Sequence, residues 1–154
     1  MEENIQSPRS DLLPFIVVTL LIVLPIRLFI AQPFIVNGAS MVPTFENGDY
    51  LIVDELTYHF RDPVTNEVII FKYPKDPSKY FIKRVVGIPG DTVDGTKLGT
   101  DEYFVEGDNR NASSDSRIWG TVKRSLIIGR PILRLLPIKT LDLLPGTDTV
   151  IAPS

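Results

Sequence analysis

Ser40 lies in a segment whose composition suits a serine nucleophile. Gly38 and Ala39 are small and would let another backbone approach the hydroxyl, while Pro43 would stiffen the exit from the loop. The same composition also suits any tight loop. Because a serine hydroxyl is a weak nucleophile, it needs a base within hydrogen-bonding distance. The first question is therefore which side chain could be that base.

The composition leaves few candidates for the base. The chain has 154 residues, a single histidine (His59) and no cysteine. These counts exclude disulfides, thiolate zinc sites, iron–sulfur clusters, cysteine nucleophiles and multi-histidine metal sites, so we expect no metal and no cofactor. We interpret His59 as a surface loop residue without a catalytic role. A lysine is then the natural base, provided that it is neutral at the working pH.

Two lysines lie in apolar runs where burial could keep the amine neutral. On a strand over residues 80–86, Phe81, Lys83 and Val85 share one face, so Lys83 would have apolar neighbours and no acidic partner. Burial of this kind disfavours the ammonium form and lowers the pKa of a lysine. Lys72 fits its own apolar run nearly as well, and most strand lysines face solvent. Periodicity alone does not choose between the two.

A third segment, residues 107–117, is dense in amide, hydroxyl and charged side chains. Asp115 and Arg117 could pair across a turn as a bidentate ion pair. The segment could be an exposed polar loop, or a hydrogen-bond network that orients a catalytic group. Asp108 and Asp115 lack the spacing of a calcium-binding loop, so no metal site is predicted here.

The N-terminal segment is apolar enough to anchor the chain in a membrane. Leu12–Ile26 contains no charge and the apolar run resumes after Arg27, so residues 12–31 would form a helix about 30 Å long. A cleaved signal peptide would need a basic region before the apolar run. A buried core helix is possible, but a helix that is apolar all round suits lipid better than the boundary of a core. We predict a short tail (1–11), a transmembrane anchor (12–31) and one further domain (32–154), and the flanking charges encode no direction.

The remainder of the chain predicts a mainly β fold. Short runs rich in Val, Ile, Phe and Tyr alternate with Gly, Pro, Asn and Asp clusters, which is typical of antiparallel strands. No long amphipathic helix is expected after residue 31. The predicted fold is a single N-terminal transmembrane helix followed by a compact antiparallel β domain. Its expected strands lie at residues 50–53, 67–73, 80–86, 103–105 and 127–128 with their neighbours.

Charge is distributed unevenly near the C-terminal end. Lys123–Lys139 contains five basic residues and no acidic residue, interleaved with leucine and isoleucine. Part of this segment could rest on an anionic membrane surface, or it could be a last strand and a short helix that close the core with solvated arginines. The net charge of −3 argues against a basic nucleic-acid-binding surface, so no nucleic-acid partner is expected.

These segments together resemble bacterial type I signal peptidases, which are membrane-bound Ser/Lys peptidases that cut signal sequences from exported proteins. Any one motif is a modest signal, but four in this order behind an anchor are specific. The similar segments are, in chain order, the hydrophobic anchor, Gly38–Thr44, Gly48–Val53, Lys83–Asp91 and Gly107–Gly120.

The resemblance implies a role for each matching residue. Ser40 matches the nucleophile, and Lys83 matches the general base, which selects it over the other strand lysine. Ser113 matches the serine whose hydroxyl holds the lysine in place. Asp115 and Arg117 match a structural ion pair near the site.

The resemblance also implies how substrate is held. The Ser40 backbone N–H matches a hydrogen-bond donor to the oxyanion. Some members have a serine that supplies a second donor at the position of Gly38. In this chain the second donor is not determined by the sequence and would be a backbone group or a water molecule. Substrate would lie extended beside residues 33–38 and the segment before Lys83. Small pockets would admit only small residues at positions −1 and −3 from the cut. Their implied lining, which would equally pass as ordinary core, is Val36, Met41, Phe45, Phe81 and Ile82.

By the same resemblance the N-terminus is cytoplasmic, the catalytic domain is extracytoplasmic at the cell membrane, and the partners are preproteins and the lipid bilayer. A short hairpin is expected within Thr92–Glu106, where larger members carry an inserted subdomain.

Two alternative functions remain. A self-cleaving Ser/Lys protease of related fold would be soluble with an N-terminal DNA-binding domain, and an inactive membrane-anchored β binding module would have lost Ser40 or Lys83. No oligomeric state is predicted.

Overall fold

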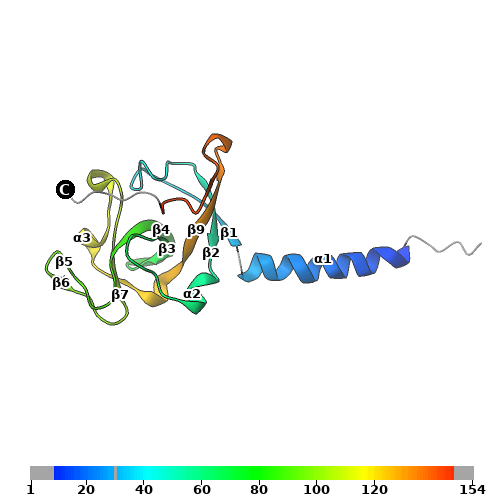
Figure 1. The fold of residues 1–154 in the computed structure, drawn as a ribbon, viewed down its shortest axis with the longest axis horizontal. Coiled ribbons are helices and arrows are strands. Elements are labelled where there is room, and N and C mark those ends of the chain that lie inside the picture. Colours follow the sequence, from blue (N-terminus) through cyan, green and yellow to red (C-terminus); the bar gives the residue numbers. More distant parts are fainter. Residues whose placement is uncertain (1–8, 30, 148–154) are drawn as a thin grey trace, which may run out of the picture.

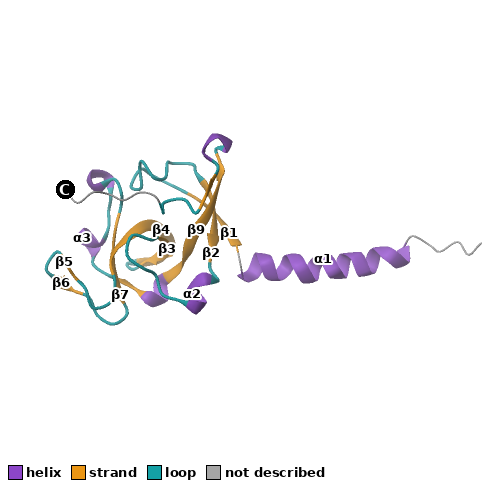
Figure 2. Ribbon diagram, in the orientation of Figure 1, coloured by secondary structure: helices purple, strands orange, loops and turns teal. Residues whose placement is uncertain are grey.

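The computed structural model describes residues 9–29 and 31–147, where one helix leads into a β domain (Figures 1 and 2). Helix α1 (Arg9–Phe29) extends away from the domain, and its side chains from Leu12 to Val23 are exposed. No helix among the described residues combines the length and the apolar character that a membrane crossing requires. Most of the predicted tail, residues 1–8, lies outside the described residues, as does residue 30 of the predicted anchor.

The domain is built on one curved antiparallel sheet, which confirms the mainly β prediction. Its strands run in the order β1-β2-β9-β3-β4-β7-β8, with β10 paired to β9. The strands of this sheet are β1 (Ala31–Ile35), β2 (Tyr50–Asp54), β3 (Val68–Tyr73), β4 (Asp76–Gly87), β7 (Glu102–Glu106), β8 (Val122–Lys123), β9 (Ile127–Leu136) and β10 (Asp142–Leu143).

The remaining elements are short. A separate hairpin of β5 (Thr92–Val93) and β6 (Thr96–Lys97) confirms the hairpin expected within Thr92–Glu106. His59 is exposed as expected, but it lies in a four-residue helix, α2 (Thr57–Phe60), and not in a loop. The other helical turns are α3 (Ser116–Trp119) and the 3₁₀ turns η1 (Arg110–Ala112), η2 (Arg124–Leu126) and η3 (Ile138–Thr140).

Two strands are longer than their sequence pattern suggested, and both continue through a proline. Pro77 lies near the start of β4, where the register with β3 shifts between Lys72 and Tyr73. Pro131 lies inside β9, opposite Val53 at another register shift. A proline cannot donate to a ladder of backbone hydrogen bonds, but at an irregularity of this kind no such bond has to be lost. Proline therefore did not end either strand.

The core is divided into two clusters, and β4 contributes to both. One cluster contains Val85 with Phe71 and Trp119, and Phe81 packs against it. The other contains Val36, Met41, Phe45, Leu51 and Val68, and Ile82 packs against it. Because successive side chains of a strand point to opposite faces, neighbouring positions on β4 enter different clusters.

The basic segment from Lys123 to Lys139 forms the end of β8, η2, β9 and the start of η3. Its three arginines are paired within the fold: Arg124 with Asp62 at 2.8 Å, Arg130 with Glu67 at 3.1 Å and Arg134 with Asp49 at 3.1 Å. These pairs favour the structural interpretation of the segment, with the difference that the arginines are ion-paired and not only solvated.

Candidate active site

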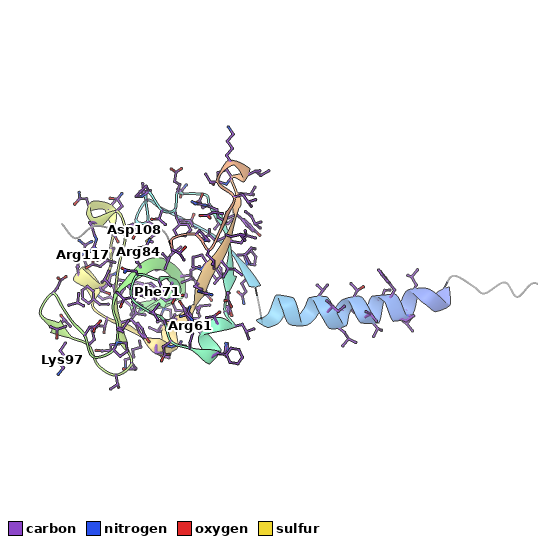
Figure 3. The ribbon with its side chains drawn as sticks, viewed as in Figure 1. Arg61, Phe71, Arg84, Lys97, Asp108 and Arg117 are labelled. Atoms are coloured by element: carbon purple, nitrogen blue, oxygen red, sulfur yellow. The ribbon has the colours of Figure 1, made fainter. Side chains whose placement is uncertain are left out.

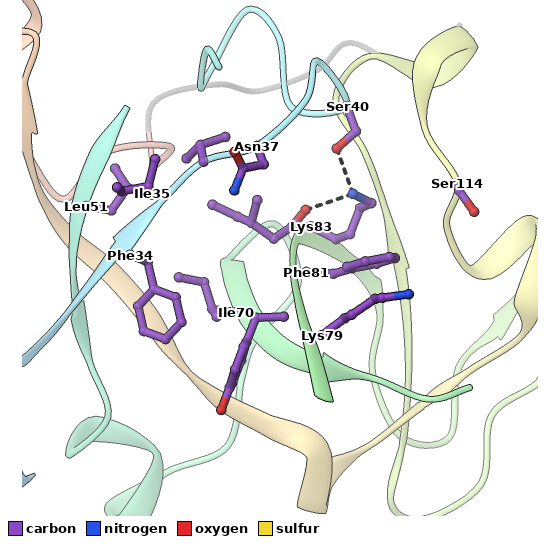
Figure 4. A pocket seen from close by; sticks show the side chains of 13 residues that line it. Phe34, Ile35, Asn37, Ser40, Leu51, Ile70, Lys79, Phe81, Lys83 and Ser114 are labelled. Carbon is purple, nitrogen blue, oxygen red and sulfur yellow. Dashed lines mark hydrogen bonds between the residues drawn. The ribbon is translucent and has the colours of Figure 1, made fainter. Parts of the chain in front are cut away.

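Ser40 and Lys83 are in direct contact, although 43 residues separate them in the chain. The Lys83 Nζ donates to the Ser40 Oγ at 2.7 Å and to the Ile82 carbonyl oxygen at 2.9 Å (Figure 4). Ser40 follows β1 in a turn, and Lys83 lies on β4 at the point where this strand begins to pair with β7. The distance between Oγ and Nζ is short enough for proton transfer between a nucleophile and its base.

The surroundings of Lys83 favour the neutral amine. The residue is 4% exposed, and its Nζ lies 5.5 Å from the centre of the Phe81 ring. Burial lowers the pKa of Lys83 to about 8, while the negative charges of Asp115 and Asp108 act in the opposite direction. At a pH near 8, about half of the Lys83 side chains can therefore accept a proton.

The turn that carries Ser40 is held by residues that the sequence analysis did not single out. The Asn109 N–H donates to the Ser40 carbonyl oxygen at 3.0 Å, and the Asn109 Nδ2 donates to the Ala39 carbonyl oxygen at 3.1 Å. A Cβ at Gly107 would collide with the Ser40 carbonyl oxygen and the Ser113 hydroxyl. Only glycine therefore fits at residue 107. Asn109 forms hydrogen bonds with the peptide groups on both sides of Ser40.

Asp115 and Arg117 form a bidentate ion pair, with Nε–Oδ1 and Nη2–Oδ2 distances both 2.8 Å. Asp115 is fully buried and also accepts from the Gly107 N–H at 3.1 Å. Burial alone would raise the pKa of Asp115, but the hydrogen bonds from Arg117 and from the Gly107 N–H lower it to about 2. Residues 107–117 are thus partly a buried network beside the turn that carries Ser40, formed by Gly107, Ser113, Asp115 and Ser116, and partly an exposed loop, which includes residues 110–112.

Ser113 lies in this network beside Gly107, and it is 8% exposed. In the part of the chain that the structure describes, the hydrogen-bond partners of the Lys83 Nζ are the Ser40 hydroxyl and the Ile82 carbonyl, and the buried Ser113 Oγ makes no hydrogen bond to the lysine. Its role in orienting Lys83 stays a prediction.

A second buried ion pair, between Arg84 and Asp108, lies next to Lys83 in the chain and was not predicted from the sequence. Arg84 donates to both carboxylate oxygens of Asp108 at 2.9 and 2.7 Å, and the two side chains are 3% and 1% exposed (Figure 3). Arg84 also donates to the carbonyl oxygens of Asn66 and Gly146, and Asp108 accepts from the Thr44 hydroxyl. One signal was available: Arg84 shares a strand face with Ile82 and Val86, and a charge on an apolar face needs a carboxylate partner.

An elongated cleft of about 600 Å³ leads to the Ser40–Lys83 pair (Figure 4). It lies between the outer edge of β1 and the β4 edge before Arg84, and among the described residues neither edge is paired with another strand. Of the predicted pocket residues, Val36, Phe81 and Ile82 line the cleft, whereas Met41 and Phe45 are fully buried beneath it. Phe34, Ile35, Asn37, Lys79 and Tyr80 also line the cleft, and they belong to the two segments that were expected to lie beside the substrate. The lining residues that the sequence analysis missed are Leu51, Ile70 and Ser114.

The Gly38 amide, considered as part of the oxyanion site, already has a partner. It donates to the Asn47 side-chain oxygen at 2.9 Å, and the φ of Gly38 is +94°, a conformation that favours glycine. The Ser40 N–H is therefore the better candidate donor. Among the described residues, no three side chains that bind metals come together.

This arrangement suits acyl transfer from an extended peptide. It supplies a hydroxyl nucleophile, a buried amine base in contact with it, and two open strand edges beside an apolar floor.

Comparison with known proteins agrees with this chemistry. A family model described as "Signal peptidase, peptidase S26" matches residues 9–98 and 92–136. The chain is 35% identical over 160 residues to "Probable signal peptidase I-1" of Synechocystis sp., covering 81% of each chain. It is 34% identical over 170 residues to "Signal peptidase I" of Leptolyngbya laminosa, covering 88% of this chain and 83% of the relative. It is 36% identical over 122 residues to "Mitochondrial inner membrane protease subunit 1" of Xenopus tropicalis, covering 73% of each.

Proposed function

Because the chain belongs to the signal peptidase family, peptidase S26, we propose that its Ser40 and Lys83 remove N-terminal signal peptides from exported preproteins. The activity is that of signal peptidase I, a serine endopeptidase. The observation that carries the residue assignment is the 2.7 Å contact between the Lys83 Nζ and the Ser40 Oγ in a buried environment. Cleavage of a purified preprotein, with the cut site located by mass spectrometry, tests the proposal.

The reaction proceeds through an acyl-enzyme. Neutral Lys83 takes the proton of the Ser40 hydroxyl while the Oγ bonds to the scissile carbonyl carbon, and the Ser40 N–H stabilises the oxyanion. The lysine ammonium then donates its proton to the leaving amine as the C–N bond breaks. Lys83 next takes a proton from water, whose oxygen attacks the ester, and returns that proton to the Ser40 oxygen when the acid product leaves. In this proposal, Asp115, Arg117 and Ser113 help to hold Lys83 in position.

The signal peptide enters the cleft as an additional strand. Residues 33–38 and 78–83 both run toward the catalytic pair, so a substrate chain whose N-terminal part fills the cleft runs parallel to both. Every second substrate side chain then points to the floor formed by Val36 and Ile82, which Met41 and Phe45 support from below. This floor leaves space for small residues at positions −1 and −3.

The rate should depend on pH through the protonation of Lys83. Its pKa of about 8 means that the active, neutral form is lost as the pH falls below that value. We expect kcat/KM to drop about tenfold per pH unit between pH 7 and 5 and to level off above pH 8. The measurement is preprotein cleavage at low substrate concentration, with thermal unfolding followed at each pH as a control. A flat profile between pH 5 and 7 would exclude a lysine base.

The apolar N-terminal residues 12–31, all of which except Ala31 precede β1, act as a single-pass anchor in this proposal, with the N-terminus cytoplasmic and the β domain extracytoplasmic. What supports the anchor is the uncharged run Leu12–Ile26 and the membrane association of the family, to which the name of the Xenopus relative also refers. The lipid bilayer is accordingly a partner of the chain.

The sheet surface beside α1 fits contact with that bilayer. Ile35, Tyr50 and Leu136 form one row across β1, β2 and β9, and both aliphatic residues are exposed. Leu143 on β10 and Ile138 on η3 are each 77% exposed and continue this apolar surface.

A label attached to this surface should report contact with lipid. The chain has no cysteine, so Ile138→Cys and Lys97→Cys each provide one attachment site for a fluorophore. Lys97 lies on the β6 hairpin, at the end of the domain opposite α1 (Figure 3). In reconstituted vesicles, lipids that carry a spin-label quencher should quench the fluorophore at residue 138 and not at residue 97. Equal quenching at both sites would contradict this orientation.

A further inference from the structure

The amide of Asn37 is a polar group in the cleft that the catalytic mechanism does not use. Asn37 is exposed and lines the same cleft as Ser40 and Lys83. Figure 4 shows its side chain pointing into the cleft between β1 and β4. Among the described residues its side-chain amide has no hydrogen-bond partner, so both its donor and its acceptor are available to a bound peptide.

The backbone fixes the face of the cleft on which this amide lies. The Val36 N–H donates to the Asp49 carbonyl oxygen at 2.9 Å, and the Val36 carbonyl oxygen accepts from the Gly48 N–H at 2.8 Å. Both polar groups of Val36 thus point away from the cleft, while its side chain is buried in the floor. In an extended chain the next residue reverses both directions. The Asn37 backbone therefore faces the open edge, and its side chain lies on the face opposite the floor.

We infer that Asn37 reads the side chain at position −2 of the signal peptide, an inference that rests on the proposed function. A bound strand that directs its −1 and −3 side chains to the floor beside Val36 and Ile82 directs its −2 side chain to the opposite face. Asn37 is the hydrogen-bonding side chain that β1 and its extension place on that face of the cleft. The group recognised is a polar −2 side chain able to accept from, or donate to, a carboxamide.

The charges along the cleft make this recognition sensitive to substitution. The two lysines that line it are Lys79, which pairs with Asp76 at 3.0 Å, and the base Lys83, which is buried against Ser40. The cleft lining contains no carboxylate. A charge introduced at residue 37 would therefore interact with the −2 side chain, and no carboxylate of the cleft lining would screen this interaction. Like charges placed there oppose binding and opposite charges favour it.

A charge-exchange experiment tests the inference. The full-length chain in detergent micelles is assayed on preproteins that differ only at −2, with glutamine, leucine, lysine or glutamate. Relative to wild type, Asn37→Asp should raise the ratio of kcat/KM for the lysine substrate over the glutamate substrate about tenfold, and Asn37→Lys should lower it about tenfold. Asn37→Leu should remove the preference for glutamine over leucine at −2.

Matched controls separate a local effect from a general one. Asn111 is also an exposed asparagine but does not line the cleft, so Asn111→Asp and Asn111→Lys should leave these ratios within twofold of wild type. An equal loss on all four substrates in the Asn37 variants would show that the amide holds the substrate backbone, and would overturn the inference. Unchanged ratios in both charged variants would overturn it as well. Wild-type protein that cleaves no preprotein would reject the proposed function itself, a result distinct from either.

Discussion

Lys83→Ala is expected to reduce kcat for preprotein cleavage by about a million-fold, and Ser40→Ala by a similar factor, because nucleophile and base act as one unit. The two groups are 2.7 Å apart, so removing either one removes the proton transfer that activates the hydroxyl. For the same reason the double variant should be no slower than the single variants. The measurement is single-turnover cleavage at excess enzyme, with products separated by mass spectrometry.

Lys72→Ala is the matched control for this prediction. Lys72 lies on the neighbouring strand β3 and was the alternative base by periodicity alone. It is only partly buried, and it does not line the cleft. Its replacement should change kcat less than twofold. Because Lys83 is buried, Lys83→Met, which keeps the apolar stem, should also be assayed. Retention of activity by Lys83→Met or by Ser40→Ala would reject the assignment of the pair.

Asp108→Ala is expected to destabilise the domain strongly. It would leave the Arg84 guanidinium, 3% exposed, without its bidentate carboxylate. Leaving one member of a buried ion pair unpaired costs about 3–5 kcal/mol. For a domain of this size, the unfolding midpoint should fall by about 10–20 °C. Thermal unfolding of the full chain in micelles, followed by circular dichroism, measures the change.

Asp142→Ala provides the comparison for that stability effect. Asp142 pairs with Arg134 at 3.5 Å, and its side chain is 45% exposed. Removal of such a partly solvated pair should cost about 0–1 kcal/mol. The combined variant Arg84→Met with Asp108→Leu should recover part of the loss, because two apolar side chains remove the unpaired charge. If Asp108→Ala shifted the midpoint no more than Asp142→Ala, the pair would not stabilise the domain.

The predictable part of the fold depended on local patterns. Alternating apolar residues located β2, β3, β4 and β7 to within a few residues, and the resemblance to a known family located the hairpin of β5 and β6. The full length of β9 was not predicted, because a proline such as Pro131 usually marks the end of a strand. Its position opposite a register shift depends on the partner strand β2, which the local sequence does not encode.

The candidate site shows the same division between local and distant information. Residue types and motif order selected Ser40, Lys83, Asp115 and Arg117, all of which lie around one catalytic turn. The residue types and motif order did not reveal that Asn109 forms hydrogen bonds with the peptide groups beside Ser40. This contact joins residues far apart in the chain, and an asparagine in a polar loop carries no signal of where its amide will bind.

By itself, the sequence determined the kind of chemistry available to this protein. Without cysteine and with one histidine, a serine nucleophile had to be paired with a base such as lysine, and the order of the motifs indicated which lysine. Only the tertiary structure decided that Lys83 can act as that base. Its pKa depends on burial, which lowers it, and on the negative charges of Asp115 and Asp108, which act in the opposite direction. The desolvation that makes the amine neutral is a property of this packing and not of the lysine or of its neighbours in sequence.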